Sequence, residues 1–358
     1  MPSLVGGFGK NSLFFLNNIP NFSNSSSFNL PNKSTNINNL PNNNLPNNNL
    51  PNSQLGPYLA GLVEGDGTIA VHDKNSTAKK YSPIIIIVFK KADLPLAQFL
   101  QTITNCGTVN LKPGRGYVLW QIHDLVGVFT IVNLINGHMR TPKIEALGRT
   151  INWFNEYIQK NQNSKLPSTQ SILSQIHPIE LKELDTSPID SNAWLAGLSD
   201  SDSNFSINIH QRKGRKGRKT TRVQLYFRIE LRQNYHRLAP QGQKVSYFSI
   251  MSIMGTYFGV TVNSRTRIQN DKEFYSFYFT ASSKISIAKA IEYFDNFPLL
   301  SSKHLDYKDW CKIFQLQNAN PLTSSYLEIA KHTRKDYNKT RTSYNWDHLK
   351  DCYLTRIK

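Results

Sequence analysis

Apolar and small residues follow helical spacing in two short stretches of the chain, one in each half. Residues 58–68 read YLAGLVEGDGT and residues 194–204 read WLAGLSDSDSN, so the second stretch repeats the first. On each predicted helix the small residues lie four positions apart and share one side; they are Gly61 with Gly65, and Gly197 with Ser201. Small residues at this spacing let two helix backbones approach closely, so we expect the two helices to pack against each other.

Each predicted helix ends in two acidic residues with one residue between them. The final acid is Asp66 in the first half and Asp202 in the second. A helix C-terminus carries partial negative charge and repels carboxylates, so acids at this position need a compensating partner. If the helices pack, Asp66 and Asp202 lie side by side, and the pair favours a bound divalent cation. One such helix alone is equally typical of a surface helix with a polar end, but its repetition argues against that interpretation.

The order of the remaining elements is repeated as well. In the first half we expect strands at 68–72, 84–89 and 117–122, a turn-and-strand segment at 107–110, and helices at 94–104, 125–136 and up to about Tyr157. In the second half we expect strands at 205–211, 223–232 and 274–280, a matching segment at 259–263, and helices at 245–258, 285–294 and beyond Lys303. Both halves follow an αββαββα order, which predicts an α+β fold of two repeats.

Composition divides the chain into four parts. Residues 1–52 are dominated by Asn, Ser, Pro and Leu and predict a disordered tail, because they hold too little apolar surface to offset the entropy of folding. The first repeat is assigned to residues 53–158 and the second to residues 191–358. Residues 159–190 are rich in Asn, Gln, Ser and Pro, and predict a linker between them.

Strand 223–232 alternates between apolar and polar side chains, which predicts a sheet with one face under helices and one open face. Any solvated antiparallel sheet alternates, but Arg, Gln and Asn also make bidentate bonds to bases in the major groove. The candidate nucleic-acid contacts of the second half are Asn208, His210, Gln224, Tyr226, Arg228, Arg232, Arg265 and Arg267. Residues 84–88 are apolar without a break, so the first half is less clear; its candidates are His72, Asn110, Lys112 and Arg115.

Charge points to a polyanionic partner. Lys and Arg number 42 against 24 Asp and Glu, a net charge of +18. A basic loop is expected at the tip of the hairpin between the first two strands of the second half, where it would track phosphates. Its cations are Arg212, Lys213, Arg215, Lys216, Arg218, Lys219 and Arg222. The three cysteines show no metal-type spacing, so neither a zinc site nor a disulfide framework is expected. The positive excess fits either a nucleic acid or an anionic membrane surface. No apolar run approaches the ~20 residues that span a bilayer, and nucleic acid rather than a membrane is the partner expected.

The repeated motif resembles the one that names the LAGLIDADG homing endonucleases and their relatives, the intron maturases. Residues 59–67 and 195–203 carry the match, with Ser203 in place of the usual Gly. The resemblance implies two pseudo-symmetric repeats forming a saddle of antiparallel sheets. It also implies that Asp66 and Asp202 bind the metal together with the backbone carbonyls of Gly65 and Ser201. Oxygen ligands without His or Cys favour Mg²⁺ over zinc.

The same resemblance implies a basic residue near each metal site. Lys143 and Lys303 follow two Pro-containing turns at corresponding positions and are the candidates, although each also fits a surface lysine in the first turn of a helix. Glu64 and Asp200 are expected to form hydrogen bonds at the helix ends rather than to act in catalysis.

Three functions remain open on the sequence. The first is a monomeric Mg²⁺-dependent homing endonuclease that cuts a long duplex DNA site, one strand for each half. The second is a maturase that binds intron RNA with the same fold. The third, a DNA-binding regulator with inactive sites, is disfavoured because both aspartates are present. The first residues, MPSLVGGFGK, resemble a stretch of cytochrome oxidase subunit I. This resemblance implies an intron reading frame that continues from an exon and a protein made in the mitochondrion; an arbitrary leader is the alternative.

Overall fold

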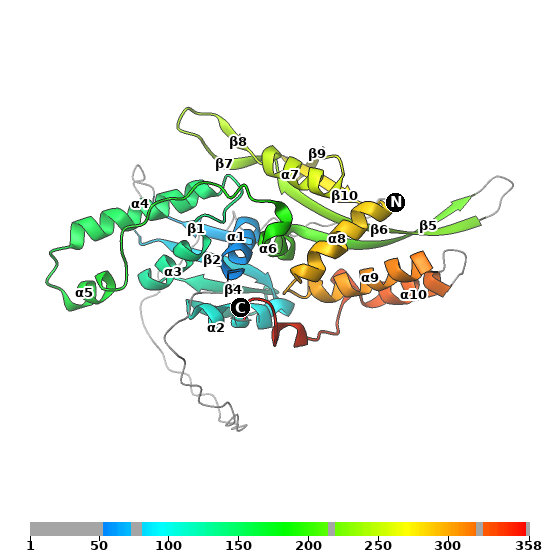
Figure 1. Ribbon diagram of the computed structural model, residues 1–358, viewed down its shortest axis with the longest axis horizontal. Coiled ribbons are helices and arrows are strands. Elements are labelled where there is room, and N and C mark those ends of the chain that lie inside the picture. The colour runs from blue at the N-terminus through cyan, green and yellow to red at the C-terminus, as the bar shows by residue number, and fades with distance from the viewer. Residues whose placement is uncertain (1–52, 73–80, 214–218, 320–324, 356–358) are drawn as a thin grey trace, which may run out of the picture.

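The computed structural model describes residues 53–72, 81–213, 219–319 and 325–355. The predicted disordered tail, residues 1–52, lies outside these ranges, as do Arg215, Lys216 and Arg218 of the basic loop. The described chain forms two halves, each built on a four-stranded antiparallel sheet, with the motif helices α1 and α6 between the sheets (Figure 1).

The first half contains the elements that its pattern predicts. In chain order they are α1 (Leu55–Asp66), β1 (Gly67–Ala70), β2 (Ile84–Lys90), α2 (Leu94–Thr104), β3 (Thr108–Lys112), β4 (Tyr117–Ile122), α3 (Leu125–Ile135) and α4 (Ile144–Asn161). The strand order in the sheet is β1-β2-β4-β3. A local hydrogen bond fixes the start of α3: the Asp124 carboxylate accepts from the Gly127 amide at 2.6 Å and so caps the helix.

The second half repeats this arrangement in the sheet order β5-β6-β10-β9. Its elements are α6 (Trp194–Asp202), β5 (Ser203–Lys213), β6 (Lys219–Arg232), β7 (Asn234–Leu238), β8 (Lys244–Ser246), α7 (Phe248–Phe258), β9 (Asn263–Gln269), β10 (Lys272–Ala281), α8 (Lys284–Asn296), α9 (Lys303–Ala319) and α10 (Ser325–Thr333). The predicted αββαββα repeat and the α+β class are therefore confirmed.

The predicted helix at 245–258 is wrong at its start. Val245 belongs to β8, which pairs with β7 in a separate hairpin, and α7 begins at Phe248. The amide of Tyr247 donates to the carbonyl of Gln233 at 2.9 Å, and this bond closes the hairpin at the end of β6. Because the partner of β8 is another strand, local apolar spacing could not distinguish it from an early turn of α7.

The chain between the halves is more structured than a plain linker. It contains α5 (Pro167–Leu173), and Ile176 and Ile179 are buried. The Asn136 side chain donates to the Glu180 carbonyl at 2.8 Å and accepts from the Lys182 amide at 3.0 Å. This segment is therefore packed along the first half, whose α4 continues to Asn161.

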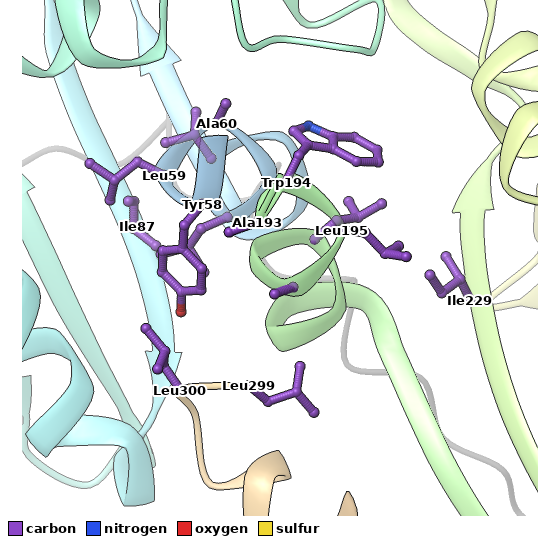
Figure 2. Close-up of a cluster of buried hydrophobic side chains, with 14 of the residues drawn as sticks. Tyr58, Leu59, Ala60, Ile87, Ala193, Trp194, Leu195, Ile229, Leu299 and Leu300 are labelled. Carbon is purple, nitrogen blue, oxygen red and sulfur yellow. The ribbon is translucent and has the colours of Figure 1, made fainter. Parts of the chain in front are cut away.

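Each sheet buries one face. In β2, Ile85 and Ile87 are fully buried under helices. Ile84 and Ile86, which alternate with them along the strand, are only half-buried on the opposite face. The apolar core continues from one half to the other: Tyr58, Leu59 and Ala60 of α1 lie near Trp194 and Leu195 of α6, with Leu299 and Leu300 beneath them (Figure 2). Within the described residues, no helix combines the length and apolarity needed to cross a membrane.

Candidate active site

The motif helices touch backbone to backbone. A Cβ atom placed on Gly61 would lie 2.0 Å from the carbonyl oxygen of Trp194, and one on Gly197 would lie 2.0 Å from that of Tyr58. Neither position has room for a side chain, because a Cβ essentially never approaches a backbone atom so closely. The close helix contact predicted from the glycine spacing is therefore present in the structure. This contact places the C-terminal ends of α1 and α6 together.

The first acid of each motif is bound across the helix pair. The Trp194 indole donates to Glu64 Oε2 at 2.6 Å, and the Tyr58 hydroxyl donates to Asp200 Oδ2 at 2.8 Å. Tyr58 and Trp194 are equivalent positions of the repeat, so the two bonds are related by the pseudo-symmetry. Sequence reasoning missed them because each joins residues of different halves, although the aromatic residue that opens both motifs is a signal that could have been used.

The same acids hold the turns that carry the candidate lysines. Glu64 accepts hydrogen bonds from the backbone amides of Arg140 and Thr141, the latter at 2.6 Å. Asp200 accepts from the amides of Leu300 and Ser301, at 2.9 and 3.1 Å. Burial raises the pKa of both acids, and the hydrogen bonds to them oppose this rise. The geometry therefore gives Glu64 and Asp200 a structural part.

Asp66 and Asp202 are the last residues of the two packed helices. A Cβ on Gly65 would lie 3.3 Å from Asp202 Oδ2, so α1 approaches the second carboxylate closely. Burial and then the charge of Asp202 raise the pKa of Asp66. Burial also raises the pKa of Asp202, while Lys303 and Lys143 oppose the rise. Two carboxylates in such proximity are costly unless positive charge lies beside them.

Lys143 and Lys303 supply positive charge from symmetric positions. Lys143 Nζ donates to the carbonyls of Val63 and Gly67 at 2.9 Å, and more weakly to that of Gly65 at 3.4 Å. Lys303 Nζ donates to the carbonyls of Ser199 and Ser201 at 3.0 and 2.7 Å. Burial lowers the pKa of Lys143 to about 8 and also lowers that of Lys303. Both ammonium groups thus cap a motif helix at its negative end.

The donor set suits a hard divalent cation. Within the described ranges, no group of three or more His, Cys, Asp or Glu side chains is placed to hold a metal. The oxygen donors at the ends of α1 and α6 are the carboxylates of Asp66 and Asp202 and the carbonyls of nearby residues. Mg²⁺ is commonly held by one or two carboxylates plus water and substrate phosphate. The carbonyls of Gly65 and Ser201 already accept lysine bonds but keep a second lone pair each. Ser203, the departure from the motif, turns its hydroxyl back onto the Ser199 carbonyl at 2.7 Å.

An open groove runs over both sheets and past the two aspartates. In the second half its wall carries most of the predicted polar set. Arg228 donates to Thr280 Oγ1 at 3.1 Å and lies 4.8 Å from the centre of the Tyr278 ring. Glu230, which was not predicted as a site residue, accepts from Arg267 at 2.5 Å and lies 3.8 Å from Arg265. Among the remaining candidates, the groove is lined by Asn208, His210, Tyr226 and Arg232 of the second half. From the first half it is lined by Arg115, which is exposed in the turn after β3.

Other predicted contacts are placed less directly. Asn110 is exposed and donates to the Gln121 side chain at 3.3 Å. Lys112 and Gln224 are half-buried on β3 and β6. The Nδ1 atom of His72 is buried, and its ring contacts that of Tyr81 edge-on. Arg212, Lys213, Lys219 and Arg222 belong to the facing strands β5 and β6 that lead to the loop tip.

Two further segments, which the sequence did not assign to the groove, also line it. One is the hairpin β7–β8, which brings His236 and Arg237 to the groove. The other follows α10 and contributes Asn338, Lys339 and Tyr344. Neither segment has an equivalent among the described residues of the first half, so the repeat gave no signal for them.

Comparisons with known proteins agree with this geometry. A family model described as LAGLIDADG endonuclease matches residues 59–154 and 195–314. The chain is 43% identical over 99% of its length, and over 82% of the relative, to "Intron-encoded DNA endonuclease aI3" of Saccharomyces cerevisiae (strain ATCC 204508 / S288c). It is 27% identical, over 78% of its length and 71% of the relative, to "Uncharacterized cox1 intron-2 37.2 kDa protein" of Schizosaccharomyces pombe (strain 972 / ATCC 24843).

Solved structures show the same fold. Meganuclease I-SmaMI bound to uncleaveable DNA matches with a TM-score of 0.55 and 20% identity, covering 81% of this chain and 99% of that one. The LAGLIDADG homing endonuclease I-GzeII in complex with its DNA target matches with a TM-score of 0.56 and 14% identity, covering 81% and 100%.

Proposed function

The chain belongs to the LAGLIDADG endonuclease family, and we propose that it is a site-specific homing endonuclease that cuts both strands of a long duplex DNA site. The observation that carries this proposal is the placement of Asp66 and Asp202 at the ends of two helices in backbone contact, beside a groove lined by both sheets. A relative named as an intron-encoded DNA endonuclease and neighbours described as bound to DNA support it.

The proposed chemistry is phosphodiester hydrolysis with Mg²⁺. Asp66 and Asp202 would hold the ion with the carbonyls of Gly65 and Ser201, and a bound Mg²⁺ supplies Lewis acidity and an activated water. Lys143 and Lys303 hold their ammonium groups at the helix ends by the hydrogen bonds described above, which fixes two positive charges beside the scissile region. We assign them the stabilisation of negative charge that develops on the phosphate.

The DNA partner is proposed to lie along the sheets, with each half facing one half-site. Arg228 and its neighbours on the second sheet would contact base edges, while the basic loop would contact phosphates. Because the chain contains both motif helices, it would act as a monomer. The relative named for a cox1 intron and the N-terminal resemblance to cytochrome oxidase subunit I support a mitochondrial location.

A second candidate is intron RNA binding as a maturase, and the basic loop supports it, since Lys and Arg side chains bind RNA phosphates as readily as those of DNA. The two functions share the fold and can coexist in one chain. They differ in whether the paired aspartates are needed, because binding and stabilising a folded RNA requires no hydrolysis.

One experiment separates these candidates. Purified full-length protein with Mg²⁺ is incubated with DNA that spans the intronless exon junction of the host gene, and the same DNA carrying the intron is the control. Double-strand cleavage of the intronless DNA alone is expected, since the intron divides the target. Failure to cut, together with tight binding of the intron RNA, would replace the endonuclease proposal with the maturase.

A further inference from the structure

The two groove walls differ in chemistry at equivalent positions. Strand register relates them: Gly67 pairs with Ile87 in the first sheet, and its repeat equivalent Ser203 pairs with Ile229 in the second. This pair sets the correspondence between the open faces of the two sheets. The first sheet carries, in order, Ile84, Ile86, Val88 and Leu119. The equivalent positions of the second sheet carry Tyr226, Arg228, Glu230 and Tyr278. Four apolar side chains thus replace two aromatic and two charged ones.

These apolar side chains belong to the open face and not to the core. The alternate residues Ile85, Ile87 and Phe89 of β2 are buried under the helices, whereas Ile84, Ile86 and Val88 are half-buried on the opposite side. Leu119 pairs with Val88 across β2 and β4 and so extends the apolar row of β2 to a patch of four side chains, while Ile86 pairs with Gln121, the polar neighbour of the patch on β4. Val88 lines the groove that also holds Asp66, and the other three patch residues continue from it along the same face of the sheet.

Charge around the patch matches a nucleic-acid duplex. The next cross-strand row consists of Lys90, Tyr117 and Lys112, so two cations lie at one end of the apolar patch, and exposed Arg115 lies in the turn beyond. An apolar surface with cations at one end fits base edges beside a phosphate backbone. This row would meet phosphates while the patch faces the floor of the major groove.

Only one group on that floor is apolar. Each base pair presents hydrogen-bond donors and acceptors in the major groove, and the C5-methyl group of thymine is the sole apolar feature. Apolar side chains pressed against other base edges would leave donors or acceptors without partners, which costs free energy. The patch therefore favours thymine methyl groups both by contact and by penalising the alternatives.

We propose that the first half reads its half-site by apolar contact of Ile84, Ile86, Val88 and Leu119 with thymine methyl groups, whereas the second half reads by hydrogen bonds. The inference rests on the proposed DNA-binding function and specifies its substrate. It predicts an asymmetric target in which one half-site has thymines, on either strand, opposite the patch. The other half-site faces arginine, glutamate and tyrosine side chains instead.

The test begins with the full-length protein and Mg²⁺, which select cleavable molecules from a library of random duplexes. Each thymine of the selected target is then replaced by deoxyuridine, which lacks only the methyl group. Binding is measured by titration in EDTA. At thymines facing the patch, each replacement should weaken binding roughly fourfold, the effect of one methyl group removed from water. The slope of log affinity against log salt should not change, because no phosphate contact is lost.

Ile86→Ala and Arg228→Ala form a matched pair, since they truncate equivalent positions of the two sheets. Ile86→Ala should weaken binding to the thymine target and lose sensitivity to deoxyuridine at the thymines it contacts. Arg228→Ala should leave that sensitivity intact. Ile86→Thr is a second variant that keeps a β-branched residue in the strand, and circular dichroism checks that each variant is folded.

Failure of this inference is distinguishable from failure of the proposed function. If no duplex is selected, the endonuclease proposal itself fails. If a target is selected but deoxyuridine has no effect anywhere, or if Ile86→Ala keeps the full wild-type sensitivity at every thymine, thymine readout by the patch is wrong. In that case the patch would face a protein or another part of the duplex.

Discussion

At the scale of single residues, the buried groups of the site are held by hydrogen bonds that the motif does not show. Glu64 and Asp200 could be assigned a structural role from their position at the helix ends. Their partners, Trp194 and Tyr58, could not, because each lies in the other half of the chain. Residue type and spacing establish which groups are polar and where the helices end. Which of these groups form hydrogen bonds with each other depends on the packing of α1 against α6.

A histidine pair near the site predicts a pH dependence of stability. The rings of His304 and His348 stack with their centres 4.2 Å apart, and their ring nitrogens face the carbonyls of Leu299 and Leu300. Burial and then His348 and Lys308 lower the pKa of His304 to about 4. The unfolded chain takes up this proton near pH 6.5, so the free energy of unfolding should fall between about pH 6.5 and 4, by on the order of 3 kcal/mol.

Urea unfolding of the wild type and of His304→Gln at a series of pH values checks this prediction. Buried carboxylates with raised pKa values contribute the opposite slope, so the difference between the two profiles isolates the histidine. The difference should change across this window and be flat above it. Parallel profiles throughout would show that His304 is protonated equally well in the folded chain.

At the scale of elements, the α1–α6 pair is the part of the fold that the sequence determines most directly. Gly61 and Gly197 are required where each helix meets the other's backbone. Most strands were also predictable, because apolar and polar residues alternate along them. The hairpin β7–β8 was not, since Val245 lies just before the apolar residues of α7, and only its pairing with β7 makes it part of a strand.

Substitution of the contact glycines by alanine gives a sharp test of this packing. A Cβ at Gly61 or Gly197 meets backbone atoms, which cannot move aside, whereas at Gly148 in α4 it meets only the tip of the Leu181 side chain at 3.0 Å. Gly61→Ala and Gly197→Ala should each destabilise the protein by at least ~1–3 kcal/mol. Gly148→Ala should be neutral or stabilising, as alanine favours a helix interior.

Chemical unfolding of the three variants measures these effects. Equal stability of Gly61→Ala and the wild type would show that the motif helices do not touch at this residue. Gly61→Leu and Gly197→Leu extend the series, and each should unfold the chain or separate its halves.

At the scale of the whole molecule, the net charge of +18 governs how the protein meets nucleic acid. Replacing all the cations of the basic loop with Ser should weaken binding to target and random DNA alike, because phosphate positions hardly depend on sequence. Each lost phosphate contact should flatten the plot of log affinity against log salt by ~0.9. Arg228→Ala should instead weaken target binding by ~1–3 kcal/mol and spare random DNA.

Titrations of both DNAs at several salt concentrations separate the two effects. If the loop variant lost affinity only for the target, at an unchanged salt slope, the loop would be reading bases. A loop variant that binds DNA normally but loses affinity for intron RNA would favour the maturase.

The central claim is that Asp66 and Asp202 form one metal-dependent centre for cutting duplex DNA. Asp66→Asn and Asp202→Asn remove a charge and keep the shape, so each variant should lose the metal while retaining the groove. The most direct measurement follows a supercoiled plasmid with one target site in Mg²⁺, together with titration of target binding. We predict that neither variant linearises the plasmid and that both bind the target about as tightly as the wild type. Linearisation by either variant at the wild-type rate would contradict the account.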